Sequence, residues 1–419
     1  MIIIWISYAV STGILILSLA QGTFAIAYTF TLLRSRRAKI DAELPKAAVV
    51  LSLRGSDPFL YNNMLAILEQ DYPDFKLFII LDSELDSAWS DVNRIQSYAP
   101  DRVATFLIQK LLSTCSLKCC ALAEVIDQLD EIYKVVVFLD GDTSPHRGWL
   151  RDLVEPLTDK KVGVSTGNRW YTPDRISWGA LVRYFWNAGA VVQVWLNGIT
   201  WGGSMAMRVE VIRQVGLVDA FRQSLVDDGT VSRLMRTHRF KTVFVPTVIM
   251  PNREDISVAS FIPWSERQLM AAKSAESGWA IVLFHAFAIG TCVIAPLIIL
   301  AIGTLQGNPV LIGLAFVSVV IYWSVAVLST LAIETGMQRV LDNNQMKAKW
   351  INKEAIICFF PAIVLSHFVY FKALAGACIR TRVSWRGIEY QVNGINDVRR
   401  LNYQPYQSSI ENHDTSSII

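Results

Sequence analysis

The chain has 419 residues, of which 52% are apolar and 18% are charged. That length accommodates a globular domain and several membrane spans, and both percentages lie away from those of a purely soluble protein. The net charge of +3 is too small to indicate a nucleic-acid partner.

The first apolar stretch, residues 2–33, is almost free of charge and longer than the ~20 residues that cross a bilayer as a helix. A cleaved signal peptide would carry its basic residues before the apolar stretch and a small-residue cleavage site after it. Here the basic residues follow the stretch, which predicts an uncleaved anchor over residues 1–33, with its N-terminus outside and the next residues in the cytoplasm. They are Arg34, Arg36, Arg37 and Lys39.

Residues 45–278 alternate short apolar runs with polar stretches of helical character. Asn62–Gln70 and Leu117–Leu129 are expected to be helices. The apolar runs have the length of strands buried on both faces, and they are Ala47–Leu53, Leu77–Leu81, Val103–Ile108 and Val135–Leu139. The alternation predicts an α/β domain with a mostly parallel sheet. Because ligands bind beyond the carboxyl ends of such strands, polar residues at those ends are the first candidates for a site.

The aromatic segment Trp186–Trp201 is interrupted by Asn187, Gln193 and Asn197. These amides favour a buried or interfacial segment over a short membrane span.

Three long apolar runs predict transmembrane helices within residues 279–379. They are about Trp279–Gly303, Pro309–Ile333 and Ala355–Ile379. The loop before the last run is basic (Arg339, Lys347, Lys349 and Lys353), as expected in the cytoplasm. Four spans in total would place the C-terminus outside, whereas Arg380, Arg382 and Arg386 after the last run indicate the inside. A tilted or re-entrant segment around Pro361 would reconcile the two.

Residues 380–419 form a C-terminal tail, and its polar end after about Tyr403 is expected to be disordered. The six cysteines contain no pair of CxxC motifs and the five histidines do not cluster, which argues against a zinc site. A disulfide framework is not expected in a cytosolic domain.

The main chemical signal is Asp140-Gly141-Asp142, directly after the expected strand Val135–Leu139. Mg²⁺ and Mn²⁺ prefer hard oxygen ligands and share their shell with phosphate oxygens. Two carboxylates at a strand end, with a glycine for the turn, can hold such a metal against a diphosphate. An ordinary Asp-Gly turn is the alternative.

Two further acidic positions are candidates. Asp82 directly follows the expected strand Leu77–Leu81, and its carboxylate could bind a nucleobase or ribose. The alternative is that Asp82 is part of an ordinary polar loop, together with Glu84 and Asp86. Asp227-Asp228 begins an expected helix, where it could supply the general base that group transfer to a hydroxyl needs, or cap the helix.

Two neighbouring motifs complete the candidates. The loop Trp201-Gly202-Gly203-Ser204-Met205 could let the backbone approach a substrate, or be a simple turn. Arg267 precedes the first C-terminal span, where it could clamp a diphosphate with its planar fork of donors or lie on a membrane-surface helix.

Taken in order, these elements resemble family 2 glycosyltransferases of the GT-A fold, closest to the ceramide glucosyltransferase-like branch, over about Pro45–Gln391. The resemblance begins with Ser52-Leu-Arg-Gly-Ser-Asp57-Pro58 and Gln70-Asp-Tyr-Pro73, and it includes Lys118. It closes with Trp385-Arg386-Gly387-Ile-Glu-Tyr390. The family's (Q/R)xxRW signature reads here as Trp264-Ser-Glu-Arg267-Gln268, so only its arginine is present. Asp227 stands where Glu is usual.

The resemblance implies a cytosolic GT-A catalytic domain over residues 45–278 of a multi-pass membrane protein. Its implied reaction is inverting transfer of a hexose from a UDP-sugar to a membrane lipid, with Mg²⁺ or Mn²⁺ as cofactor. The implied roles are metal binding by Asp140 and Asp142, donor binding by Asp82, Lys118, Asp140 and Arg267, and base catalysis by Asp228.

Two other functions are compatible with the sequence. A processive polysaccharide synthase of the cellulose or hyaluronan type would ordinarily need more spans and a complete QxxRW signature. A non-catalytic membrane scaffold would not need the acidic residues that this chain carries.

Overall fold

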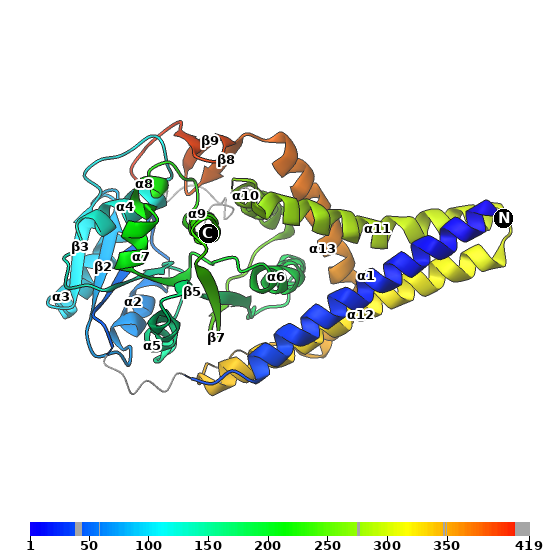
Figure 1. Ribbon diagram of the computed structural model, residues 1–419, viewed down its shortest axis with the longest axis horizontal. Coiled ribbons are helices and arrows are strands. Elements are labelled where there is room, and N and C mark those ends of the chain that lie inside the picture. The colour runs from blue at the N-terminus through cyan, green and yellow to red at the C-terminus, as the bar shows by residue number, and fades with distance from the viewer. Residues whose placement is uncertain (38–43, 58, 275–276, 347, 349, 407–419) are drawn as a thin grey trace.

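The computed structural model describes residues 1–37, 44–57, 59–274, 277–346, 348 and 350–406. Lys39, Pro58, Lys347, Lys349 and the tail from residue 407 onward lie outside the described residues. A globular domain sits at one end of the molecule, and long helices project from it (Figure 1).

The globular domain is built on a seven-stranded sheet with the order β3-β2-β1-β4-β6-β5-β7. Its strands are β1 (Ala47–Ser52), β2 (Phe75–Leu81), β3 (Val103–Leu107), β4 (Val135–Leu139), β5 (Val162–Tyr171), β6 (Ser204–Arg208) and β7 (Lys241–Asn252). Strands β1 to β4 pair in parallel, and β6 runs antiparallel to both β4 and β5. The predicted α/β class with a mostly parallel sheet is confirmed.

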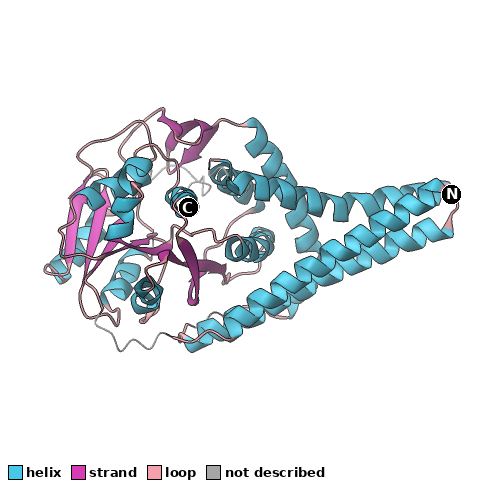
Figure 2. Ribbon diagram, viewed as in Figure 1, coloured by secondary structure: helices cyan, strands magenta, loops and turns pink. Residues whose placement is uncertain are grey.

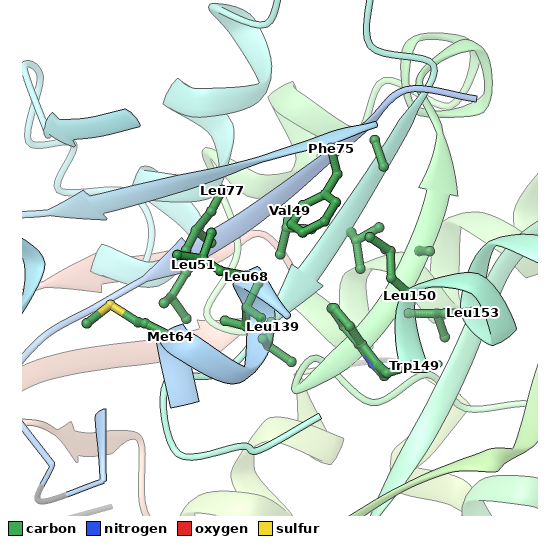
Figure 3. Packing of buried hydrophobic residues seen from close by; sticks show 14 of the residues in the cluster. Val49, Leu51, Met64, Leu68, Phe75, Leu77, Leu139, Trp149, Leu150 and Leu153 are labelled. Carbon is green, nitrogen blue, oxygen red and sulfur yellow. The ribbon is translucent and has the colours of Figure 1, made fainter. Parts of the chain in front are cut away.

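Helices cover both faces of this sheet (Figure 2). Val49 and Leu51 of β1 face a core completed by α2 (Leu60–Leu68), α3 (Trp89–Tyr98) and α5 (Trp149–Val154). Part of this core, with Trp149 and Met64, is seen in Figure 3. The alternate residues Ala48 and Val50 face a second core, as the two-residue period of a strand requires. That core includes α4 (Leu117–Asp127), α7 (Val209–Gln214), α8 (Leu217–Phe221) and α9 (Asp227–Thr237).

Two further helices connect the globular domain to the long helices. They are α6 (Trp178–Leu196) and α10 (Val258–Lys273). Helix α6 packs against β5, α10 and α13, which fits the expectation of a buried segment over Trp186–Trp201. A short 3₁₀ helix, η1 (Glu155–Thr158), follows α5.

Four helices are long and apolar enough to cross a membrane: α1 (Ile2–Leu33), α11 (Ser277–Leu305), α12 (Pro309–Asn343) and α13 (Lys353–Ile379). The first three pack on one another and form the projecting bundle in Figure 1. Their exposed faces carry large apolar side chains such as Phe284, Phe287 and Phe316, as expected of helices that contact lipid.

Helix α13 begins and ends on the side of the globular domain. Before it, the Asn344 amide donates to the carbonyl of Thr247 in β7 at 2.8 Å. After it comes a small antiparallel sheet of β8 (Arg382–Trp385), β9 (Ile388–Gly394) and β10 (Asp397–Arg400), where the Tyr390 hydroxyl accepts from the Leu117 amide of α4 at 3.2 Å. The C-terminal sheet therefore lies on the same side as the globular domain, which favours the tilted or re-entrant arrangement of the last apolar run.

The tail departs from one expectation. Gln404 and Tyr406 are described and both contact Arg54 after β1, so the expected disorder after about Tyr403 is wrong for these residues. From residue 407 onward the tail lies outside the described residues.

Candidate active site

A cavity of about 970 Å³ opens at the carboxyl ends of β1, β2 and β4. Arg54, Asp82 and Asp140 line it from the loops after these strands, and Asp228 lines it from α9. The polar residues that follow separate strands in sequence therefore lie around one cavity, as the parallel sheet predicted.

Asp140 and Asp142 flank the turn after β4. The carbonyl of Asp140 accepts from the Thr143 backbone amide at 3.3 Å, which closes the turn. A Cβ on Gly141 would lie 2.7 Å from the end of the Leu53 side chain, which follows β1, so a larger residue there would require that side chain to shift. The side chains of Asp140 and Asp142 are 26% and 13% exposed, and both line the cavity.

Arg169 of β5 joins the two carboxylates, a role that the sequence analysis missed. Its Nη2 lies 3.0 Å from Asp142 Oδ2 and 3.6 Å from Asp140 Oδ2. Burial by itself would raise the pKa of Asp140, but Lys118 and Arg169 together hold that pKa below its ordinary value. Asp140 is therefore ionised at neutral pH.

Lys118, near the start of α4, bridges the two acidic motifs. Its Nζ lies 2.7 Å from Asp140 Oδ1 and 2.9 Å from Asp227 Oδ2. Burial opposes the charge of this ammonium, but the two carboxylates raise its pKa above the ordinary value. Lys118 thus contacts carboxylates at a position that borders the cavity.

Asp228 lies in the first turn of α9, as predicted, and its carboxylate faces the cavity. Oδ1 accepts from the Gly229 amide at 2.6 Å, and Oδ2 accepts from the Gly202 amide at 3.4 Å. Burial and the negative charge of Asp227 raise the pKa of Asp228 to about 6, although Lys118 and the two amides act in the opposite direction. A carboxylate with this pKa is ionised at neutral pH and is more basic than an ordinary aspartate.

The Gly202-Gly203 loop lets the acidic groups come close to the backbone. A Cβ on Gly202 would lie 2.6 Å from Asp227 Oδ2, and a Cβ on Gly203 would lie 2.9 Å from Asp140 Oδ2 and closer still to the Trp201 ring. A side chain at Gly202 would displace the Asp227 carboxylate, and one at Gly203 would displace the Trp201 ring and the Asp140 carboxylate.

Asp82 forms an ion pair through Oδ2 with Nη1 of Arg54, and its side chain is 2% exposed. Among the residues that the structure describes, Asp82 Oδ1 has no hydrogen-bond partner. Burial raises the pKa of Asp82, while Arg54 lowers it. The neighbouring Asp86 has a structural role, because it accepts from the Gly55 amide at 2.9 Å and from the Ala88 amide at 2.8 Å.

Arg267 of α10 lines the same cavity, near Trp385 and Arg386 of the C-terminal sheet. Its guanidinium carbon lies 5.6 Å from the centroid of the Trp385 ring. Burial and the charge of Arg386 lower the pKa of Arg267 to about 10, so the guanidinium remains charged at neutral pH. The predicted donor residues Asp82, Lys118, Asp140 and Arg267 thus all border one cavity.

The residues fit a hard divalent cation. Asp140 and Asp142 offer carboxylate oxygens to the cavity, which is the donor chemistry that Mg²⁺ and Mn²⁺ prefer. No group of three or more His, Cys, Asp or Glu side chains suited to a metal occurs within the described residues. Such a cation would therefore take much of its shell from outside the protein, as Mg²⁺ does with substrate phosphates and water.

The cavity extends from these charged residues into the long helices. Beyond Asp228 and Trp201 it is lined by α1, α6, α11, α12 and α13, for example by Phe24, Ala326 and Ile363. Most lining surface in this part is apolar, with the amide of Gln21 and the hydroxyl of Ser329 among the exceptions. Tyr322 and His367 also line this part, and the Tyr322 hydroxyl lies 2.7 Å from His367 Nε2.

Comparison with known proteins identifies the family. A mannosyltransferase from Pyrobaculum calidifontis, PcManGT, solved with GDP-Man and Mn²⁺, is 16% identical with a TM-score of 0.49, over 88% of this chain and 99% of that chain. GalNAc-T7, solved with UDP, GalNAc and Mn²⁺, is 12% identical with a TM-score of 0.37, over 57% of this chain and 54% of that chain. The model of glycosyl transferase family 21 matches residues 12–396, which is most of the chain. The chain therefore belongs to glycosyl transferase family 21, in agreement with the ceramide glucosyltransferase-like resemblance of its motifs.

Proposed function

We propose that this glycosyltransferase moves a hexose from a UDP-sugar to a lipid acceptor, with inversion at the anomeric carbon. The observation that carries the proposal is the continuity of one cavity, which joins the carboxylates of the sheet to an apolar chamber between the long helices. A lipid that lies among these helices could present a hydroxyl to Asp228 while its chains remain in apolar surroundings.

Asp228 is the proposed general base. It accepts the proton of the acceptor hydroxyl as the hydroxyl oxygen attacks the anomeric carbon and the nucleoside diphosphate leaves from the opposite face. The pKa of about 6 suits this role, because the carboxylate is ionised at neutral pH and still holds a proton better than an ordinary aspartate. Lys118 and the Gly202 amide orient and stabilise the acidic pair from which Asp228 acts.

The remaining residues serve the donor. Asp140 and Asp142 would hold Mg²⁺ or Mn²⁺, which when bound neutralises charge on the leaving diphosphate. Arg267, which lines the same cavity, would supply a second positive charge for the diphosphate. Asp82 would accept a hydrogen bond from the uracil base, since its Oδ1 has no partner among the described residues. Arg169 and Lys118 limit the repulsion between the carboxylates.

The membrane arrangement follows from the charge pattern. The catalytic domain, residues 45–278, would face the cytoplasm, because Arg34, Arg36 and Arg37 follow α1 on its side of the membrane. The cytoplasm also supplies nucleotide-sugars, and the apolar helices admit the acceptor from the bilayer.

The test uses the full-length protein in lipid nanodiscs with Mn²⁺, a panel of UDP-sugars and a total lipid extract as acceptor pool. Mass spectrometry then searches for a lipid that has gained one hexose. The expected product disappears with EDTA and with Asp142→Ala, and its mass identifies both the sugar and the acceptor.

Other outcomes would redirect the proposal. Long polymer made by the purified protein would favour a processive synthase. Absence of UDP release by the folded protein with every donor would favour a non-catalytic scaffold.

A further inference from the structure

The C-terminal residues 401–406 leave β10 and run beside the loop after β1. The Leu401 amide donates to the carbonyl of Glu389 in β9 at 2.9 Å, and Asn402 Oδ1 accepts from the Glu389 amide at 2.7 Å. This C-terminal segment, residues 401–406, is thereby fixed to the small sheet before it reaches the catalytic domain.

Arg54 connects the C-terminal segment to Asp82. Its Nη2 donates to the carbonyl of Gln404 at 2.7 Å, and its Nε donates to the carbonyl of Arg386 at 2.9 Å. The remaining terminal nitrogen, Nη1, forms the ion pair with Asp82. Because a guanidinium is a rigid plane, the two carbonyls of the C-terminal region fix the direction in which Nη1 reaches the carboxylate.

Two tyrosines of the segment reinforce this contact. The Tyr403 hydroxyl donates to the backbone carbonyl of Asp82 at 3.2 Å. The Tyr406 ring lies with its centroid 5.5 Å from the Arg54 guanidinium carbon. The ring also packs on Gly55, where a Cβ would lie 2.9 Å from it and where φ is +81°, so that only glycine is comfortable there.

Arg54 and Asp82 line the cavity, whereas residues 401–406 are not among its lining residues and contact these two through hydrogen bonds. The segment therefore acts through these two residues. Arg386 lies in the tight turn between β8 and β9 and has a φ of +47°, which is uncommon for a residue other than glycine. Its carbonyl is the one that accepts the hydrogen bond from Arg54 Nε.

We propose that the C-terminal segment 401–406 is a positioning element of the donor site, which holds Arg54 and through it sets the Asp82 carboxylate for recognition of the nucleobase. The proposal rests on the proposed function, in which Asp82 binds the base of the donor nucleotide. It predicts that the segment controls donor affinity and base selectivity, and that it has little influence on the transfer step itself.

The test compares full-length protein, a chain ending at residue 400 and a chain ending at residue 406 as matched control. UDP, CDP and GDP binding with Mn²⁺ is measured by calorimetry in nanodiscs, and KM for the donor and kcat are measured separately. The chain ending at residue 400 is expected to bind UDP at least about tenfold more weakly, since hydrogen bonds to charged groups contribute about that much. It should also discriminate less among the three bases and retain its kcat at saturating donor. The chain ending at residue 406 should match the full-length protein.

Point variants keep the test decisive if the short chain does not fold. Tyr406→Ala is expected to raise KM for the donor, and Tyr406→Phe, which keeps the ring on Gly55, is expected to restore it. Equal UDP affinity in full-length protein and in both disrupting variants would overturn the inference and leave the proposed function intact. So would a fall in thermal stability or kcat with donor KM and base selectivity unchanged. If the full-length protein binds no nucleotide, the proposed function fails as well.

Discussion

The two ends of the cavity differ in the side chains that line them: one end has paired charges and the other is mainly apolar. At the end in the sheet, carboxylates and cations alternate, and Lys118 and Arg169 each contact two acidic groups. At the end among the long helices, the lining is mainly apolar, with a few polar side chains such as Gln21, Tyr322 and His367. Buried charges require partners, whereas an apolar lining requires only a shape that fits its occupant. The charged end should therefore govern chemistry and donor binding, and the apolar end should govern the acceptor.

The largest effect is expected for the base at the charged end. Asp228→Asn should lower kcat roughly 10²–10⁴-fold, because the amide cannot accept the acceptor proton. UDP-sugar binding, measured by calorimetry, should be retained. Asp219→Asn, at an 82% exposed side chain on α8, is the matched control. Normal turnover in Asp228→Asn would remove Asp228 from the mechanism.

Asp142→Asn should weaken Mn²⁺ binding at least about tenfold in the presence of UDP, because groups one step removed from a metal already contribute that much. The metal is titrated by the paramagnetic resonance signal of free Mn²⁺. Asp101→Asn, on the exposed turn before β3, should leave the titration unchanged. An unaltered Mn²⁺ affinity in Asp142→Asn would contradict the metal assignment.

At the apolar end, Ala326→Leu should raise KM for the lipid up to about tenfold, since an extra side chain in a filled space costs about 1–3 kcal/mol. KM for the UDP-sugar should not change. Ala326 of α12 is 4% exposed, whereas Val317 on the same helix is 53% exposed, so Val317→Leu is the control. If the KM for the UDP-sugar rose together with the KM for the lipid, the assignment of the apolar end to the acceptor alone would be wrong.

The smallest expected effect is a shift in pH dependence. Activity should fall as the pH drops through about 6, because Asp228 then takes up a proton and loses its capacity as a base. Asp227→Asn removes a negative charge that raises this pKa, so the acidic limb of the kcat profile should move to lower pH. The profile of Asp101→Asn should coincide with that of the unaltered protein. A limb that stays in place or moves upward would mean that another group controls it.

Local sequence patterns were sufficient for the first half of the sheet. Most of each strand from β1 to β4 is an apolar run, and the candidates Asp82 and Asp140 directly follow β2 and β4. Strand β5 was not predicted, because Gly163, Gly167, Asn168 and Arg169 interrupt its apolar pattern. Strand β6 was treated as part of a glycine loop, and its antiparallel pairing depends on partners distant in sequence.

The cations of the site illustrate the same limit. Asp140 and Asp142 could be found because they follow a recognisable strand, but nothing near Arg169 in sequence indicates that it pairs with Asp142. Arg54 and Arg386 are 332 positions apart, and only the tertiary structure reveals their mutual hydrogen bonds. A charged residue inside an otherwise apolar segment, as at Arg169 and Arg183, is the one signal that could have drawn attention to such positions.

The contacts between Arg54 and Arg386 also have a consequence for biosynthesis. A nascent chain emerges from the ribosome in order, so β1 with Arg54 is available long before the β8–β9 turn. Throughout translation the growing protein can insert its helices and form its acidic motifs while the surroundings of Asp82 remain incomplete. The pocket beside Arg54 reaches its final form only when nearly the whole chain has been made, so premature termination would leave a membrane-bound fragment without that pocket.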